Sequence, residues 1–311
     1  MHDFDDLPIP TTRYFDPTTD FGFKKLFGEE SNKDLLIDFL NTLMPDFHQI
    51  ADLSFLKNEQ LPEEEEMRRV IFDVFCQTAS GDNIIVEMQK AGQLRFLDRT
   101  IYYSSVAISK QGEKGKKWDY QLKPVYFIGI LNFHYDKDIS YWKKRKLLRT
   151  FEIKDEDNIS MSDKLVYKLL QLAFFRKKEQ QLKTHFDKWC FFLKNLKNLD
   201  HIPNILNEPI FMKAFDTAEV SKMDDAEYFL YRKSLNNDVD YRLSIEYALE
   251  EGEKRGEKRG EKRGEKRKLD ESIIGLLKQH ILSPEQIAFA LHTSLDYVLK
   301  IKKQLEKGKE K

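Results

Sequence analysis

The chain has 311 residues, of which 41% are hydrophobic and 34% charged, with a formal net charge of −1 and a pI of about 6.7. This size allows one sizeable core and a second folded unit, and the charge excludes a protein that binds nucleic acid through overall positive charge. The only two cysteines, Cys76 and Cys190, lie in apolar segments, so both are expected to be reduced core residues. The acidic first ten residues lack the order of a signal peptide, and no apolar run is long enough for a bilayer. We therefore expect a cytoplasmic protein without membrane contact.

The N-terminal region predicts a loose arm followed by two helices. Residues 1–13 form the expected arm, and the sequence DPTTD then offers an N-cap for a helix through FGFKKLF. Asp20 lies in the first turn, where it either stabilises the helix start or reaches a metal site. Lys24 and Lys25 follow within a turn and either face a phosphate or are simply solvated. Residues 32–44 have a clear helical period.

Residues 70–78 (VIFDVFCQT) and 83–89 (NIIVEMQ) predict a β-hairpin closed by a turn around Gly81. Both strands are rich in β-branched and aromatic residues, yet they contain the carboxylates of Asp73 and Glu87. A buried carboxylate is costly unless it has a partner, and a divalent cation can serve two of them at once. The hairpin is therefore a candidate metal site.

The register of this hairpin decides whether the acidic side chains meet. Glu87 and Gln89 share one face because side chains alternate along a strand. A three-residue loop over residues 80–82 places Asp73 opposite Gln89 and diagonal to Glu87, whereas a two-residue turn sends Asp73 to the other face. We therefore predict an odd-length loop or a bulge.

The segment after the hairpin predicts a helix and a buried strand. Arg95, Arg99 and Tyr102 fall on one face of the helix at i, i+4 and i+7, where they either bind a phosphate or pair with acidic side chains of the protein. The run LKPVYFIGILNF then indicates a central strand. Together these elements predict an α/β fold with a mixed central sheet flanked by helices.

The C-terminal part is expected to be helical. Residues 142–158 form either an edge strand or an extension of the preceding domain, and residues 151–250 are expected to be a helical region, with a helical period from residue 163. Residues 251–267, in which GEKR is repeated four times over 252–267, form a flexible linker or a marginal continuation of the preceding helix. Residues 268–311 form a small tail in which Ser283 opens a capping box. Its two short helices have a helix-turn-helix-like outline, which serves either DNA reading or packing and oligomerisation.

An Asp in one strand followed, after a short turn, by Glu-x-Gln in the next resembles the PD-(D/E)XK nuclease superfamily, and more narrowly the PD-(D/E)XK family transposases, the recombination-promoting nuclease group. The resemblance covers residues 14–135, and Gln89 stands where most superfamily members carry Lys, although the transposase-like subgroup commonly has Gln. The stretches similar to that group are DFGFKKLFG, FLNTLM, VEMQ, FLDRTIYYSSVAISKQ and LKPVYFIGILNF.

This resemblance implies a restriction-endonuclease-like nuclease domain over residues 1–150, followed by the helical C-terminal region. It further implies a metal-dependent DNA endonuclease that hydrolyses phosphodiester bonds and promotes recombination. Two concerted cuts would need two active sites, which is compatible with a homodimer.

The resemblance also assigns roles to the site residues. Asp73 and Glu87 would bind one Mg²⁺ or Mn²⁺, with the main-chain carbonyl of Met88 as a third ligand and Asp20 as a further candidate. Gln89 does not titrate and would orient the attacking water. The candidate DNA-binding residues are Lys24, Lys25, Arg95, Arg99 and Tyr102.

A competing hypothesis is a protein that keeps the nuclease fold but acts as a DNA-binding or protein-interaction module without efficient cleavage. Gln in place of Lys at position 89, and the open role of Asp20, motivate this alternative.

Overall fold

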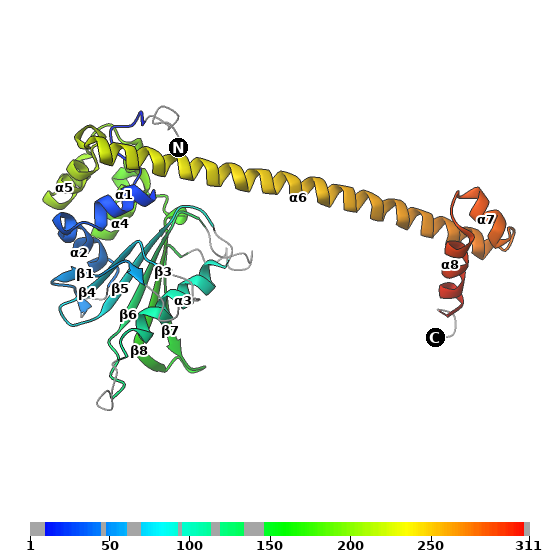
Figure 1. Cartoon of the computed structure of the whole chain (residues 1–311), viewed down its shortest axis with the longest axis horizontal. Helices are drawn as coiled ribbons and strands as arrows, with labels where there is room; N and C mark the ends of the chain where they lie inside the picture. The colour runs from blue at the N-terminus through cyan, green and yellow to red at the C-terminus, as the bar shows by residue number, and fades with distance from the viewer. Residues whose placement is uncertain are drawn as a thin grey trace. The chain divides into compact units, whose positions relative to one another are not determined.

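The chain divides into two compact units, Met1–Asp238 and Val239–Lys311. The first unit contains a β-sheet with helices on both faces, and the second is helical (Figure 1). The computed structural model describes residues 10–44, 48–60, 70–92, 95–112, 119–133 and 146–307.

A six-stranded mixed sheet forms the centre of the first unit (Figure 1), as the sequence predicts. Strands β5, β6 and β8 are parallel, whereas β1, β4 and β7 run antiparallel to their neighbours. In sheet order the strands are β1 (Leu53–Phe55), β4 (Val74–Thr78), β5 (Asn83–Gln89), β6 (Val125–Leu131), β8 (Ser160–Gln171) and β7 (Leu148–Lys154); β2 (Glu59–Gln60) and β3 (Val70–Ile71) form a separate ribbon.

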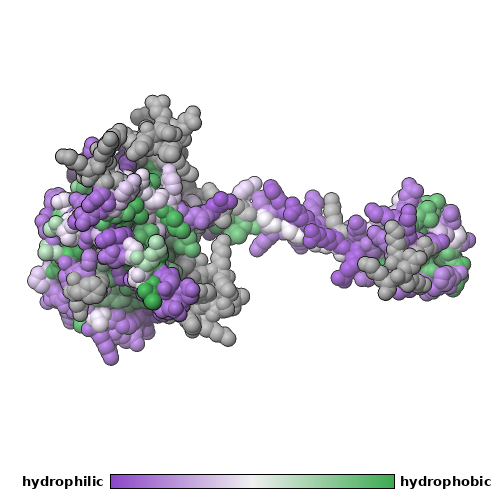
Figure 2. Space-filling view, turned by 90° about the horizontal axis from the view of Figure 1, so that it is seen from below, coloured by the Kyte–Doolittle hydropathy of each residue, from purple (hydrophilic) through white to green (hydrophobic). Residues whose placement is uncertain are grey.

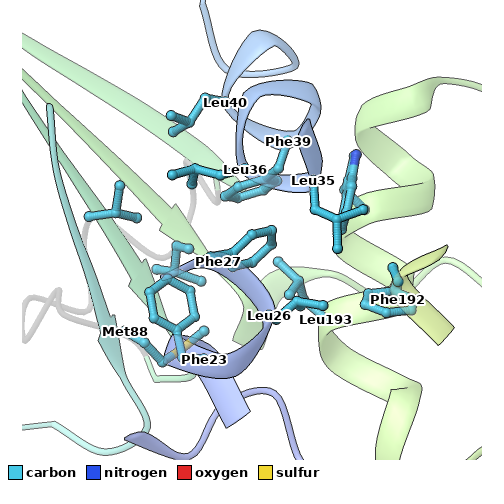
Figure 3. Packing of buried hydrophobic residues seen from close by; sticks show 14 of the residues in the cluster. Phe23, Leu26, Phe27, Leu35, Leu36, Phe39, Leu40, Met88, Phe192 and Leu193 are labelled. Carbon is cyan, nitrogen blue, oxygen red and sulfur yellow. The ribbon is translucent and has the colours of Figure 1, made fainter. Parts of the chain in front are cut away.

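Helices cover both faces of this sheet. Even-numbered residues of β4 and β5, such as Val86 and Met88, pack against helices α1, α2, α4 and α5 in the larger core (Figure 3). Odd-numbered residues such as Ile85 pack against α3 in a smaller core.

None of the described helices combines the length and apolar composition needed to cross a bilayer. The α-helices are α1 (Asp20–Phe27), α2 (Lys33–Asn41), α3 (Phe96–Ser109), α4 (His185–Asn195), α5 (Pro209–Ala218), α6 (Asp225–Gln279), α7 (Pro284–Ala290) and α8 (Leu295–Lys307), with 3₁₀ turns η2 (Glu30–Asn32), η5 (Leu172–Phe174), η6 (Glu179–Gln181), η7 (Leu196–Asn198), η8 (Asn204–Leu206) and η9 (Val220–Lys222).

The strands at the centre of the sheet are buried along their full length. Every residue of β5 and β6 is buried, because parallel strands with helices on both sides have no solvent-facing surface. This explains the long apolar run of β6. It also means that Glu87 and Gln89, which interrupt the apolar run of β5, are enclosed with it.

Helix α1 begins where the sequence predicts. Thr19 is its N-cap, and the Thr19 Oγ1 accepts a hydrogen bond from the Gly22 N–H at 3.0 Å. The cap fixes the direction in which α1 leaves the preceding segment. Asp20 and Lys24 are thereby held on a defined turn of the helix.

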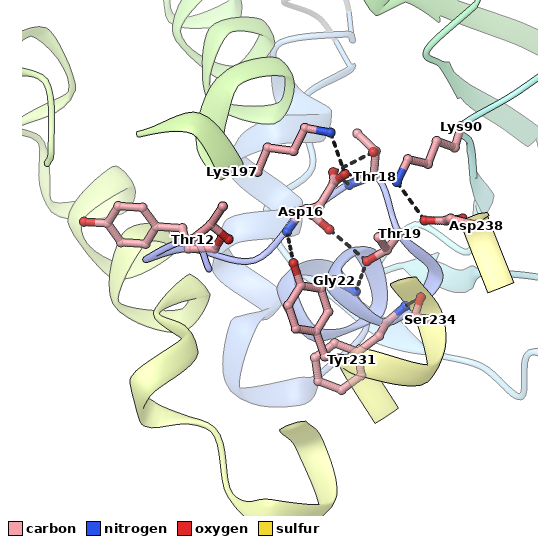
Figure 4. A network of polar contacts seen from close by, with 12 residues as sticks. Thr12, Asp16, Thr18, Thr19, Gly22, Lys90, Lys197, Tyr231, Ser234 and Asp238 are labelled. Carbon is pink, nitrogen blue, oxygen red and sulfur yellow. Dashed lines mark hydrogen bonds and ion pairs between the residues drawn. The ribbon is translucent and has the colours of Figure 1, made fainter. Parts of the chain in front are cut away.

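The buried carboxylate of Asp16 joins several segments that are distant in sequence (Figure 4). Its Oδ2 accepts hydrogen bonds from Lys90 Nζ at 3.0 Å and Lys197 Nζ at 2.9 Å, and its Oδ1 accepts from Thr18. The main-chain N–H of Asp16 donates to the hydroxyl of Tyr231 at 2.8 Å. Burial alone would raise the pKa of Asp16, but Lys90, Thr18 and Lys197 lower it to about 2.

Cys76 on β4 and Cys190 on α4 are both buried and free, as the sequence predicts. Burial raises the pKa of the Cys76 thiol to about 12 and also raises that of Cys190.

The prediction that residues 151–250 are helical is wrong for their first part. Leu148–Lys154 and Ser160–Gln171 are the strands β7 and β8, which complete the six-stranded sheet. The run KLVYKLLQL is apolar on both faces at its end, where Leu169 and Leu170 are both buried, and such a short run cannot be distinguished from a helix by period. Helices predominate from His185 onward.

The second unit consists of the C-terminal part of α6 together with α7 and α8. The GEKR repeat lies within α6, so it continues the preceding helix, the second of the two alternatives drawn from the sequence. The face of this part of α6 that Figure 2 shows is mainly hydrophilic. Ser283 and Gln286 form the predicted capping box, and His292, with φ of 48°, lies in the turn before α8. The small core is Ile273, Ile287, Ala288, Val298 and Ile301.

Replacing Phe27 by Ala should destabilise the first unit by about 3–5 kcal/mol, because Phe27 is fully buried against Phe39 and Trp189. All three tryptophans precede Asp238, so urea unfolding followed by tryptophan fluorescence reports on this unit. Phe151→Ala, at a side chain that is 41% exposed, is the matched control and should cost less than about 1 kcal/mol. Equal effects of the two changes would contradict the assigned core.

Candidate active site

The carboxylates of Asp73 and Glu87 meet at one end of the β4–β5 pair. The register pairs Val74 with Val86, so its continuation places Asp73 opposite Glu87. The Asp73 N–H donates to Glu87 Oε1 at 3.2 Å, and the Met88 N–H donates to Asp73 Oδ2 at 2.8 Å. Two carboxylates from different strands are thus joined through main-chain hydrogen bonds.

The hairpin loop has an odd length, as predicted, but lies one residue earlier. The Thr78 N–H donates to the Asp82 carbonyl at 2.9 Å, which leaves three residues, 79–81, in the loop. Gly81 takes a φ of +90°, a conformation that favours glycine. The prediction that Asp73 stands opposite Gln89 is therefore wrong. The difference amounts to two residues of register, so Asp73 and Glu87 still share a face.

Asn58 explains why the strand is interrupted at Asp73. Its side-chain Nδ2 donates to the Asp73 carbonyl at 3.0 Å, and its Oδ1 accepts from the Phe75 N–H at 3.0 Å. Its main-chain carbonyl accepts from the Phe72 N–H. These bonds stand between the β1–β4 pair and the β2–β3 pair, where the strand ladder is interrupted, and there the Asp73 N–H donates to Glu87. Asn58 could not be predicted as a site residue from the sequence, because a single Asn outside a motif carries no distinctive signal.

Both carboxyls are held in surroundings that disfavour their charge. Burial is the main cause that raises the pKa of Asp73 to about 6, while the Met88 N–H and the charges of Lys24 and Arg99 act in the opposite direction. Burial, and after it the charge of Asp73, raise the pKa of Glu87 well above its ordinary value. The site is therefore short of positive charge.

These residues fit a hard divalent cation. Carboxylate oxygens are its preferred protein ligands, and a cation would offset the repulsion between Asp73 and Glu87. The Met88 N–H points to Asp73, and the N–H and C=O of one residue in an extended strand point to the same side, so the Met88 carbonyl lies on that side too. Within the described ranges no three side chains of His, Cys, Asp or Glu are arranged to hold a metal ion. The oxygens available to such a cation are those of two carboxylates and a main-chain carbonyl.

Asp20 lies near this donor set without joining it. Its side chain is 66% exposed, and its Oδ1 lies 2.7 Å from Lys24 Nζ. The charge of Asp20 contributes to the raised pKa of Asp73. Helix α1 thus brings one acidic and one basic side chain to the edge of the site.

Gln89 and Lys90 diverge at the end of β5. Gln89 is 9% exposed and shares the face of Glu87 by strand alternation. Lys90 points to the other face, as predicted, and donates to Asp16 and Asp238. The amide at position 89 is therefore the last polar side chain that β5 directs toward the carboxylates.

The structure separates the candidate DNA-binding residues into two groups. The charges of Lys24 and Arg99 act on both carboxylates, so these two side chains lie near the site. Lys25 is ion-paired with Glu29 and Glu227. Arg95, in a left-handed conformation before α3, and Tyr102, 41% exposed on α3, lie on the surface.

A cleft of about 570 Å³ opens on Asp73. One side is formed by α1 and the segment after it, and Asn58 lies beside Asp73. The remaining side comes from α6, more than 150 residues further along the chain, and no local sequence signal predicts it. Its residues are Leu230, Lys233, Ser234 and Asn237.

The mixed sheet with its flanking helices, and the two carboxylates at the start of β4 and near the end of β5, define a restriction-endonuclease-like α/β protein. The family model described as PD-(D/E)XK nuclease family transposase matches residues 17–248, and the chain belongs to this family. Comparison of the chain with curated proteins and with solved structures returned no significant match.

Replacing Asp73 by Asn should stabilise the protein at neutral pH. The wild-type carboxyl has a higher pKa in the folded protein than in the unfolded chain, so wild-type stability falls as the pH rises from about 4 to about 6. Asn keeps an acceptor for the Met88 N–H but carries no charge. We expect a gain of up to about 3 kcal/mol at pH 7 without divalent metal, and little difference below pH 4.

Urea unfolding from pH 4 to pH 8 in the presence of chelator tests this expectation, with the exposed Asp157→Asn as control. A wild type that is more stable than Asp73→Asn at pH 7 would show that the charge on Asp73 is compensated within the protein.

Proposed function

We propose that this protein is a metal-dependent DNA endonuclease of transposase-like type, which hydrolyses phosphodiester bonds and promotes recombination. The observation that carries this proposal is the pair of Asp73 and Glu87, two buried carboxylates with raised pKa values that share hydrogen bonds at the end of one hairpin. A purely structural hairpin gains nothing from such a pair, because replacing both groups by apolar residues would remove the burial cost.

Asp73, Glu87 and the main-chain carbonyl of Met88 would hold one Mg²⁺ or Mn²⁺. When bound, this ion would activate a water molecule and neutralise charge that develops on the phosphate. Gln89 would orient that water through its amide, since it has no proton to exchange at neutral pH. Asp20 is a further candidate ligand only if it leaves Lys24.

Positive charge near the carboxylates would bind the substrate phosphates. Lys24 and Arg99 are the cations whose charges act on both Asp73 and Glu87. They would fill the role of the ammonium group that Gln89 cannot supply. Because the net charge of the chain is −1, DNA binding would depend on such local groups, with Lys25, Arg95 and Tyr102 as further contacts. A cytoplasmic location and a homodimer that makes two cuts belong to the same proposal.

One observation favours a second candidate, a DNA-binding module that does not cleave. Gln89 replaces the usual lysine, and the next residue, Lys90, is committed to Asp16 and Asp238 on the opposite face of β5. No cation from the motif strand therefore reaches the carboxylates. The two candidates differ in whether metal-dependent cleavage occurs.

Nicking of supercoiled plasmid distinguishes them. Purified wild type should cleave with Mg²⁺ or Mn²⁺ and not with chelator, and Asp73→Ala and Glu87→Ala should each lower the rate by at least about 100-fold. Glu156→Ala, at an exposed turn, is the matched control and should cleave like wild type.

Cleavage that survives both site substitutions would place the active site elsewhere. Inactive wild type that still retards DNA on a gel would favour the binding module.

A further inference from the structure

The first four turns of α6 are fastened to the rest of the first unit along one stripe. Glu227 pairs with Lys25, and the Tyr231 hydroxyl accepts from the Asp16 N–H. The Ser234 hydroxyl accepts from the Phe21 N–H at 3.3 Å, and Asp238 Oδ2 accepts from Lys90 Nζ at 2.7 Å. Figure 4 shows the last three of these α6 residues facing the Asp16 region. Positions 227, 231, 234 and 238 recur at i, i+4, i+7 and i+11, which is one face of a helix.

The neighbouring stripe of the same helix lines the cleft that opens on Asp73. Leu230, Lys233 and Asn237 follow at i, i+3 and i+7, rotated from the fastened stripe. Because the fastened stripe fixes the helix, these side chains have a defined position opposite α1. The first four turns of α6 thus form one wall of the candidate active site.

The three lysines that line this cleft differ in their ion pairing. Lys24 is ion-paired with Asp20, and Lys25 with Glu29 and Glu227. Lys233 is exposed, and among the residues that the structure describes it has no acidic partner. Among the described lysines of the cleft, Lys233 is therefore the one that can bind a ligand without first leaving an acidic partner.

The rest of the stripe suits a nucleotide chain. Asn237 is exposed one turn beyond Lys233, and its amide can donate to a phosphate or sugar oxygen. Leu230, which is 50% exposed inside the cleft, offers an apolar contact for a sugar or base. In this row Lys233 can contact a phosphate, Asn237 a phosphate or sugar oxygen, and Leu230 a sugar or base.

We infer that this stripe of α6 binds the sugar-phosphate backbone of the DNA substrate beside Asp73, with Lys233 contacting a phosphate next to the one that is cut. This inference rests on the proposed function and adds a binding surface to it. Lys233 is a binding residue and takes no part in the bond-breaking step. Its contact would be independent of base sequence, because every phosphate presents the same charge.

The test compares Lys233→Glu with Lys258→Glu. Both substitutions change the charge of the same helix by the same amount, but Lys258 lies in the repeat of the second unit and does not line the cleft. Binding of a fluorescent DNA duplex to the full chain is measured by anisotropy in chelator over a range of salt concentrations. Michaelis parameters for cleavage are then measured with Mn²⁺.

Lys233→Glu should weaken DNA binding about tenfold at low salt and reduce the slope of log affinity against log salt by about one. It should raise KM with kcat within about twofold of wild type, because only binding is lost. Lys258→Glu should match wild type in DNA affinity, in salt slope, in KM and in kcat. Asn237→Ala should raise KM less than Lys233→Glu does. Unchanged thermal unfolding shows that each variant is folded.

Failure of the inference and failure of the proposed function give different results. Unaltered binding by Lys233→Glu, or equal losses in the two charge-reversed variants, would overturn the α6 contact while wild-type cleavage still stood. If Lys233→Glu weakens DNA binding, Lys258→Glu does not, and neither wild type nor variants cleave DNA, the α6 contact would be supported and the proposed nuclease activity rejected. Wild type that binds no DNA would overturn both.

Discussion

The buried carboxylate of Asp16 is the interaction on which the arrangement of the first unit depends. It receives Lys90 from the end of the motif strand and Lys197 from the turn after α4, while its main chain is held by Tyr231 of α6. Each partner comes from a different part of the sequence. A buried ion cluster of this kind adds little net stability compared with apolar packing, but removal of one partner leaves an uncompensated charge. The cluster therefore specifies which segments meet.

Asp16 and Asp73 show how the same side chain serves two purposes. Both are enclosed by the protein. Asp16 is surrounded by two lysines and a threonine, and its pKa falls to about 2. Asp73 has main-chain and more distant positive partners and the second carboxylate of Glu87 beside it, and its pKa rises to about 6. Positive groups thus compensate the charge of Asp16 but not that of Asp73. This difference is expected if Asp16 is a structural carboxylate and Asp73 a functional one, as we propose.

The parts that could be predicted from the sequence are those whose determinants are close together in the chain. The hairpin, the shared face of Asp73 and Glu87, the cap of α1 and the capping box at Ser283 all follow from short-range pattern. The exact register did not, because Asn58, which interrupts the strand at Asp73, acts from outside the motif. The helix predicted in place of β8 is wrong because the burial of β8 on both faces depends on two apolar cores whose other residues lie far away in the chain. The α6 wall could not be foreseen, since nothing local to Lys233 indicates that it lies opposite α1.

The buried thiols of Cys76 and Cys190 allow opening of the first unit to be followed by chemical modification. Cys76 and Cys190 belong to the same apolar core, on a strand and on a helix that packs over it, and neither is accessible in the folded state. A thiol reagent can modify them only after that core has parted, and burial keeps them protonated until then. The second unit contains no cysteine. When the core recloses faster than the reagent reacts, the rate of thiol modification relative to that of an accessible thiol gives the free energy of opening of the sheet-containing unit alone, without an engineered site.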